Sequence, residues 1–98
     1  MKTADVVIVG CGVSGLYCAL NISKDKKIVM VTKSKAEESD SYLAQGGICV
    51  LRGEEDYDSY FEDTMRAGHY ENNKESVDIM LRGSEEVIAD LVKYDVDF

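Results

Sequence analysis

The chain has 98 residues, 45% of them hydrophobic, and a formal net charge of −8 from 19 acidic and 11 basic residues. This length accommodates one domain or part of one, and so acidic a chain is a poor match for nucleic acid, which binds basic surfaces. No run of about 18 apolar residues could form a membrane-spanning helix, and the N-terminus lacks the apolar stretch of a signal peptide. We therefore expect a cytoplasmic protein with no nucleic-acid partner and no membrane partner.

Two β-branched runs, at residues 5–9 and 28–32, predict the first two strands. Nearly unbroken apolar runs are typical of strands buried on both faces of a parallel sheet. Residues 14–23 between them predict a helix. Its apolar side would consist of Leu16, Ala19, Leu20 and Ser23. Together these segments form a strand–helix–strand unit, whose crossover should be right-handed.

The middle of the chain predicts loops and a third helix. Residues 33–40 are polar and irregular, residues 41–48 read SYLAQGGI, and residues 49–51 suit a short extended piece. A helix should follow and end near Gly68, because glycine commonly terminates helices. Its apolar stripe consists of Tyr57, Tyr60, Phe61, Thr64 and Met65.

A long helix is predicted after that turn, with Asn72 as its N-terminal cap and Glu75 three residues later. Its apolar stripe consists of Val77, Met80, Leu81, Ser84, Val87, Ile88, Leu91 and Val92. Gly83 inside this helix costs about 1 kcal/mol relative to alanine, which suggests close packing there. The whole pattern predicts an α/β fold: a Rossmann-like βαβ dinucleotide-binding unit, then a Gly-rich loop and two helices.

The turn after the first strand carries a glycine fingerprint. Its residues are Gly10, Cys11, Gly12, Val13, Ser14 and Gly15, in the pattern GxGxxG. In a strand–turn–helix context the first glycine permits the tight turn, the second admits a pyrophosphate, and the third lets helix and strand pack closely. The helix N-terminus adds unpaired N–H groups that favour a phosphate. This turn is therefore the predicted dinucleotide site.

The acid that usually follows the second strand and binds ribose is missing, since that strand ends Val31-Thr32-Lys33-Ser34 and the next acid is Glu37. The simplest NAD-binding interpretation therefore loses support. Thr32 could offer a hydroxyl group to the ligand. Lys33 could offer its charge to a phosphate, or it could be a solvated surface residue.

The cysteines and the histidine do not suggest a metal site. Cys11, Cys18 and Cys49 are odd in number and lack CxxC spacing, so we expect reduced and mostly buried thiols. His69 is the only histidine and has no partner at ligand spacing.

Several segments together resemble a known family. GCGVSGLYCAL, VMVTKS, SYLAQGGI, YFEDTMRAG and a long helix ending near VDF are similar to the start of the L-aspartate oxidase family. These flavoenzymes are related to the flavoprotein subunits of succinate dehydrogenase and fumarate reductase. The resemblance covers essentially the whole chain, and AQGGI and EDTMRAG are more specific than the glycine pattern. Because the family's chains are several times longer, we expect residues 1–98 to be the N-terminal portion of an incomplete FAD-binding domain.

The resemblance implies which residues hold FAD. Residues 10–15 would lie against the pyrophosphate, and Lys33 would take the place of the ribose-binding acid. A loop would wrap the cofactor and reach the isoalloxazine; it consists of Asp40, Ser41, Tyr42, Leu43, Ala44, Gln45, Gly46 and Gly47. Bare backbone at Gly46 and Gly47 could approach the flat ring and adopt positive φ, and its N–H groups could bond the flavin edge.

Asp40 bears on how the flavin is attached. Relatives with covalent flavin carry a histidine five residues before the glutamine of AQGG, where this chain has Asp40. An aspartate cannot form a histidyl–flavin bond, so the resemblance implies noncovalent FAD. A carboxylate beside a phosphate is nevertheless unusual, whereas Ser41 suits that position.

The family's reaction would oxidise L-aspartate to iminoaspartate, with oxygen or fumarate as acceptor, and the product would pass to quinolinate synthase in NAD biosynthesis. The resemblance implies that the substrate-binding and catalytic residues, and the capping domain, lie beyond these 98 residues, so we expect no catalytic residue in this chain and no activity of the chain alone. Its arginines, Arg52, Arg66 and Arg82, read as surface residues. Two alternatives remain open: a fumarate reductase-like flavoprotein, and a noncatalytic nucleotide-binding module.

Overall fold

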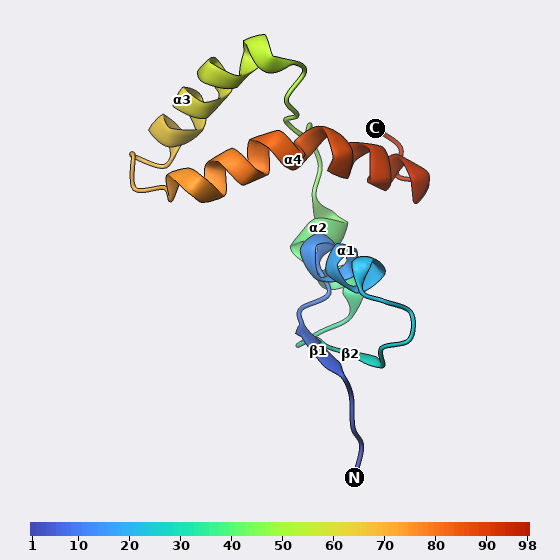
Figure 1. Cartoon of the computed structure of the whole chain (residues 1–98). Helices are drawn as coiled ribbons and strands as arrows, with labels where there is room; N and C mark the ends of the chain where they lie inside the picture. The colour runs from blue at the N-terminus through green and yellow to red at the C-terminus, as the bar shows by residue number, and fades with distance from the viewer. The chain divides into compact units, whose positions relative to one another are not determined.

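The computed structural model describes all residues, 1–98, and forms two compact units, Met1–Gly46 and Gly47–Phe98 (Figure 1). The first unit is mixed α/β and the second is helical. The elements are β1 (Val6–Val9), α1 (Val13–Asn21), β2 (Ile28–Val31), the 3-10 helix η1 (Ala36–Glu38), α2 (Asp40–Leu43), the 3-10 helix η2 (Glu54–Asp56), α3 (Tyr57–Ala67) and α4 (Lys74–Lys93).

The first unit contains the predicted strand–helix–strand arrangement. β1 and β2 pair in parallel, in a register that sets Val6 opposite Ile28 and Val9 opposite Val31. The pairing extends to the next residue, because the backbone N–H of Gly10 donates to the carbonyl oxygen of Val31 at 2.7 Å. The turn that follows β1 is therefore held at the end of β2.

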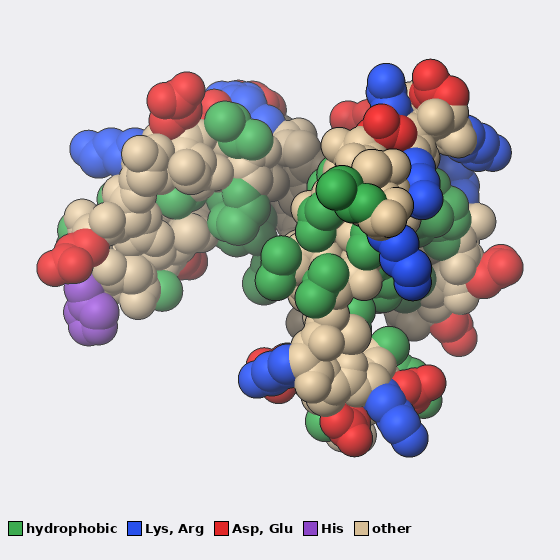
Figure 2. Space-filling view, turned by 90° about the horizontal axis from the view of Figure 1, so that it is seen from below, with side chains coloured by type: hydrophobic (Ala, Val, Ile, Leu, Met, Phe, Trp, Pro, Cys, Tyr) green, Lys and Arg blue, Asp and Glu red, His purple; other side chains and the backbone are tan.

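Burial in this sheet differs from the prediction of strands covered on both faces. Exposure alternates along both strands, and only Ile8 is buried, at 8% exposure, while Val9 is 84% exposed. The physical reason is that α1 packs on β1 and covers one face of it. In the space-filling view of Figure 2, hydrophobic side chains lie among charged ones on the visible surface of the molecule.

The packed face of α1 agrees with the expected apolar side at Ala19 alone, since Ser23 and the two leucines are exposed. Leu16 and Leu20 are 46% and 55% exposed. Gly15, Ala19 and Ile22 are half-buried instead. These three lie at positions i, i+4 and i+7, which share one helix face. The close approach to the strand end is made at Gly15, where a Cβ would lie 2.3 Å from the carbonyl oxygen of Gly10.

The second unit is built on the two predicted helices, α3 and α4. Its core consists of Met65, Val77 and Leu81, against which Tyr57, Tyr60 and Phe61 pack. These six residues belong to the two predicted apolar stripes, which confirms the periodicity. Residues 49–51, expected to be extended, form no strand.

Two expected details of α4 are wrong. The N-terminal cap is Asn73, whose side-chain oxygen accepts from the N–H of Ser76 at 2.9 Å. Asn72 instead donates from Nδ2 to the carbonyl oxygen of Thr64 at 3.2 Å. Gly83 is not closely packed, since an added Cβ would meet nothing within 4 Å.

The thiols are less buried than expected. Cys11 is half-buried, and Cys18 and Cys49 are exposed. The buried hydrophobic residues are Ile8 and the three members of the helical core, so none of the thiols reaches a core. No helix has both the length and the apolar character needed to cross a membrane.

Candidate nucleotide-binding site

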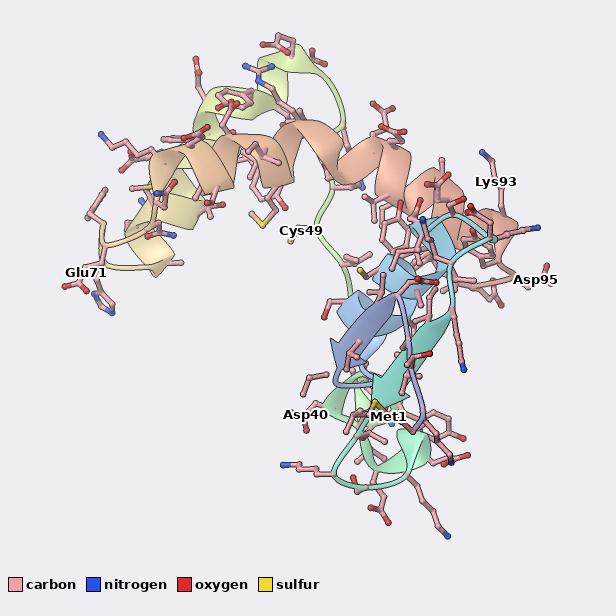
Figure 3. The ribbon with its side chains drawn as sticks, turned by 60° about the horizontal axis from the view of Figure 1, so that its bottom comes forward. Met1, Asp40, Cys49, Glu71, Lys93 and Asp95 are labelled. Atoms are coloured by element: carbon pink, nitrogen blue, oxygen red, sulfur yellow. The ribbon has the colours of Figure 1, made fainter.

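The first unit has a cavity of about 500 Å³ beside the carboxyl ends of its strands. It is lined by Val9, Gly10, Cys11, Gly12, Val31, Thr32, Lys33, Ser34, Glu38, Ser39, Asp40 and Ser41. Figure 3 shows the arrowheads of β1 and β2 pointing toward the segment that carries Asp40. Ligands of open α/β sheets bind outside the carboxyl ends of the strands, so this cavity is the candidate site.

Each fingerprint glycine has a separate geometric reason to lack a side chain. Gly10 has φ +108°, a conformation that other residues rarely adopt. A Cβ on Gly15 would lie 2.3 Å from the carbonyl oxygen of Gly10, so the third glycine allows α1 to approach the strand end. A Cβ on Gly12 would lie 3.1 Å from Ser41 Oγ and would project toward α2. The tight turn at Gly10 and the close approach of α1 at Gly15 thus agree with two of the three expected roles, and the role of Gly12 toward a pyrophosphate stays a prediction.

The N-terminus of α1 is capped by a residue far along the chain. Gly12 is the N-cap position and has no side chain to offer. The N–H of Val13 donates instead to Ser41 Oγ at 2.9 Å. Sequence reasoning selected both residues as ligand contacts but could not predict their bond across 28 residues. The bond places the start of α2 against the amide that the fingerprint assigns to a phosphate.

The predicted flavin loop is partly helical. Its first residues form α2, whose N-cap Ser39 accepts from the N–H of Tyr42 at 3.2 Å. This corrects the expectation of an irregular loop, and Ser39 in the sequence is the capping signal that could have revealed the helix. Gly46 has φ +127°, as a glycine-dependent bend requires, whereas Gly47 has no positive φ and begins the second unit.

The structure brings together only some of the predicted site residues. Seven line the cavity: Gly10, Cys11, Gly12, Thr32, Lys33, Asp40 and Ser41. Val13 joins them through its bond to Ser41. The remaining eight do not line it: Ser14, Gly15, Tyr42, Leu43, Ala44, Gln45, Gly46 and Gly47. The cavity therefore joins part of the glycine turn and the end of β2 to the first two residues of the predicted flavin loop.

The polar side chains after β2 differ in whether they have a hydrogen-bond or ion-pair partner. Thr32 Oγ1 donates to the carbonyl oxygen of Ser34 at 3.0 Å and accepts from Cys11 Sγ at 3.2 Å. Since a hydroxyl has one proton and two lone pairs, Thr32 keeps one acceptor position for a ligand, and its predicted contact stays a prediction. Lys33 and Glu38 both line the cavity and take part in no ion pair.

The second unit carries a polar cluster that sequence reasoning missed. The Tyr57 hydroxyl and Arg82 Nε both donate to Asp78 Oδ1, the second at 2.9 Å. The guanidinium carbon of Arg82 also lies 4.3 Å from the centre of the Tyr57 ring. The hydrogen bond from Tyr57 is the largest cause that lowers the pKa of Asp78, and the hydrogen bond from Arg82 is the next. The hydrogen bond to Asp78, and after it burial, raises the pKa of Tyr57. The cluster connects α3 to α4; only its Asp78–Arg82 pair, at i,i+4, was visible in the sequence.

A parallel strand–helix–strand unit with a glycine turn beside such a cavity is the geometry of a nucleotide-binding α/β protein. The chain belongs to the FAD binding domain family, whose model matches residues 5–98. FAD is therefore the cofactor of the domain to which this chain belongs.

Curated relatives are L-aspartate oxidases. The chain is 47% identical over 97 residues to the enzyme of Clostridium perfringens, covering 99% of this chain and 22% of the relative. It is 47% identical over 94 residues to that of Clostridium acetobutylicum, covering 96% and 22%, and 33% identical over 98 residues to the chloroplastic enzyme of Arabidopsis thaliana, covering 99% and 15%. The chain thus spans about a fifth of the length of the clostridial relatives. No solved structure matches it.

Proposed function

We propose that residues 1–98 are the N-terminal portion of the FAD-binding domain of an L-aspartate oxidase, and that the first unit is a Rossmann-like dinucleotide-binding unit. The whole protein would oxidise L-aspartate to iminoaspartate, with oxygen or fumarate as acceptor. The observation that carries this proposal is the 47% identity to a bacterial L-aspartate oxidase over 99% of the chain. The product would supply quinolinate synthase in NAD biosynthesis.

The glycine turn fits the cofactor's pyrophosphate. Gly10 and Gly12 leave backbone bare on the cavity wall, where a side chain at Gly12 would project to 3.1 Å from Ser41 Oγ. The N–H of Val13 stands at the start of a nine-residue helix, whose partial positive charge favours an anion. Its present partner is a neutral hydroxyl, which can share or yield this donor to a phosphate oxygen. The ammonium group of Lys33, which has no ion pair, adds positive charge.

The loop from Asp40 to Gly47 would hold the flavin portion. When bound, FAD supplies the hydride-accepting group for oxidation of an amine. The contribution of this chain would be to position that group: backbone N–H groups around Gly46 would bond the ring edge. The positive φ of Gly46 supports a glycine-dependent bend in this loop. Asp40, at the position of the covalent histidine of related enzymes, leaves FAD bound noncovalently.

Substrate binding and proton transfer require groups beyond those assigned in this chain. Recognition of two substrate carboxylates calls for arginines, but Arg66 and Arg82 are engaged with Asp63 and with Asp78 and Glu54. Arg52 lines a separate open hollow of the second unit. These contacts support a division in which residues 1–98 bind cofactor and the rest of the protein binds aspartate.

The test is an assay of the intact protein that contains this chain. We expect the purified protein to be yellow, to release FAD on acid precipitation, and to oxidise L-aspartate with consumption of oxygen or reduction of added fumarate. Reduction of fumarate by a reduced donor without oxidation of aspartate would show a fumarate reductase-like flavoprotein instead. Bound FAD with neither activity would leave the noncatalytic nucleotide-binding module, and both results contradict the oxidase.

A further inference from the structure

Glu38 is a carboxylate at the cavity for which neither the fold nor the glycine fingerprint supplies a role. It ends η1 and lines the same cavity as Lys33, Gly10 and Gly12. Its side chain forms no ion pair, although Lys33 borders the same space. The fingerprint could not identify it, because the expected acid belongs at the end of the second strand and Glu38 lies seven residues beyond Val31.

The adenosine half of FAD presents a ribose with two neighbouring hydroxyl groups near the end of β2 in proteins of this architecture. Two hydroxyl donors are best satisfied by the two oxygens of one carboxylate, through charge-assisted hydrogen bonds. The residues that directly follow β2 do not meet this need. Lys33 can only donate. Thr32 Oγ1 already accepts from Cys11 Sγ and donates to the carbonyl oxygen of Ser34, so its one remaining lone pair cannot accept from both ribose hydroxyl groups.

Two carboxylates line the cavity, Glu38 and Asp40. Asp40 directly precedes Ser41, whose Oγ is 2.9 Å from the N–H of Val13, where the pyrophosphate would bind. A negative charge beside a phosphate is unfavourable. Glu38 is separated from that position by the cap residue Ser39 and belongs to η1. Of the two acids, Glu38 is therefore better placed for an uncharged sugar.

We propose that Glu38 accepts hydrogen bonds from the ribose hydroxyl groups of the adenosine half of FAD, and so replaces the acid that is missing at the end of β2. This rests on the proposed function, in which FAD occupies the cavity. The carboxylate makes the site selective for an unmodified ribose, because loss of a hydroxyl would leave an acceptor without its donor, and a phosphate would add a like charge.

Glu38→Gln tests this, with Glu37→Gln as the matched control. Both glutamates lie on η1 and are exposed, but Glu37 does not line the cavity. The apo form of the intact protein is titrated with FAD and with the FAD analogue that contains 2′-deoxyadenosine, using flavin fluorescence. We expect wild type and E37Q to prefer FAD over the analogue by about tenfold, the effect of one hydrogen bond to a charged group.

In E38Q the amide keeps one neutral acceptor oxygen, so we expect weaker FAD binding by about tenfold and a preference over the analogue clearly below that of E37Q, since the affinity for the analogue should change less. If E38Q and E37Q bind FAD equally and discriminate equally, Glu38 is not the ribose acceptor, while FAD binding itself stands. If Asp40→Asn alone abolishes the discrimination, the acceptor is Asp40 and the proposal is overturned. If the wild-type protein binds no FAD, the proposed function fails together with this inference.

Discussion

The contact between α1 and the strand end gives the sharpest test of the glycine turn. In Gly15→Ala the new Cβ would lie 2.3 Å from the carbonyl oxygen of Gly10 and 3.4 Å from Ile8 Cγ2. An ordinary carbon–oxygen contact is about 3.3 Å, so α1 must withdraw by about 1 Å. The opposing atom is backbone oxygen, which cannot rotate aside as a side chain could.

The magnitude follows from two opposing effects. Overpacking of this kind costs about 1–3 kcal/mol, and its backbone partner places it near the upper end. Alanine in place of glycine within a helix returns up to about 1 kcal/mol. We therefore expect a net loss of about 2 kcal/mol. Gly83→Ala is the matched control, since its Cβ would meet nothing within 4 Å, and it should stabilise α4 by up to about 1 kcal/mol.

The assay combines urea unfolding of the intact protein with FAD titration. Gly15→Ala should lower the unfolding midpoint and weaken FAD binding by about tenfold, because the α1 amide shifts away from the pyrophosphate. Gly83→Ala should leave FAD affinity unchanged. Equal midpoints and affinities for the Gly15→Ala and wild-type proteins would refute the close approach of α1 to the turn.

Three further changes test other contacts. Gly46→Ala should weaken FAD binding and cost about 1–3 kcal/mol of backbone strain, because the φ of Gly46 is +127°. Gly47→Ala should unfold like wild type. An equal loss of stability in the two variants would contradict this. Ser41→Ala removes the cap of α1 and should cost about 1 kcal/mol in a urea titration, and an unchanged midpoint would exclude the bond. The hydrogen bonds from Tyr57 and then from Arg82 lower the pKa of Asp78 below its ordinary value of 3.8. The ionised carboxylate therefore stabilises the fold at pH values above 3.8. This stability is lost as the pH falls through the lower pKa of the folded state. Asp78→Asn should flatten that acid limb in pH-dependent unfolding; an unaltered limb would count against the cluster.

Local patterns predicted the elements well because each depends on neighbours in sequence. The β-branched runs located β1 and β2, and the 3.6-residue period of α3 and α4 selected Met65, Val77 and Leu81. Gly15 was predicted to permit close packing and does so. These features follow from backbone periodicity and the missing Cβ, which the sequence displays directly.

Features that depend on tertiary contacts were not predicted. Two adjacent asparagines could cap α4 by their sequence. Asn73 is the cap in the structure, because the side chain of Asn72 is hydrogen-bonded to Thr64 in α3. The bond from Val13 to Ser41 joins residues 28 apart, and no local pattern encodes it. Glu38 likewise lines the cavity from η1, outside the position at the end of β2 where the fingerprint expects an acid.

The most direct test of the central claim is the crystal structure of the intact protein after addition of FAD. The account predicts a pyrophosphate oxygen within hydrogen-bonding distance of the N–H of Val13, with Ser41 Oγ shared or displaced, and the adenosine ribose in the cavity beside Lys33. FAD bound elsewhere, with Val13 still bonded to Ser41 as at 2.9 Å here and no phosphate near Gly10 or Gly12, would contradict it.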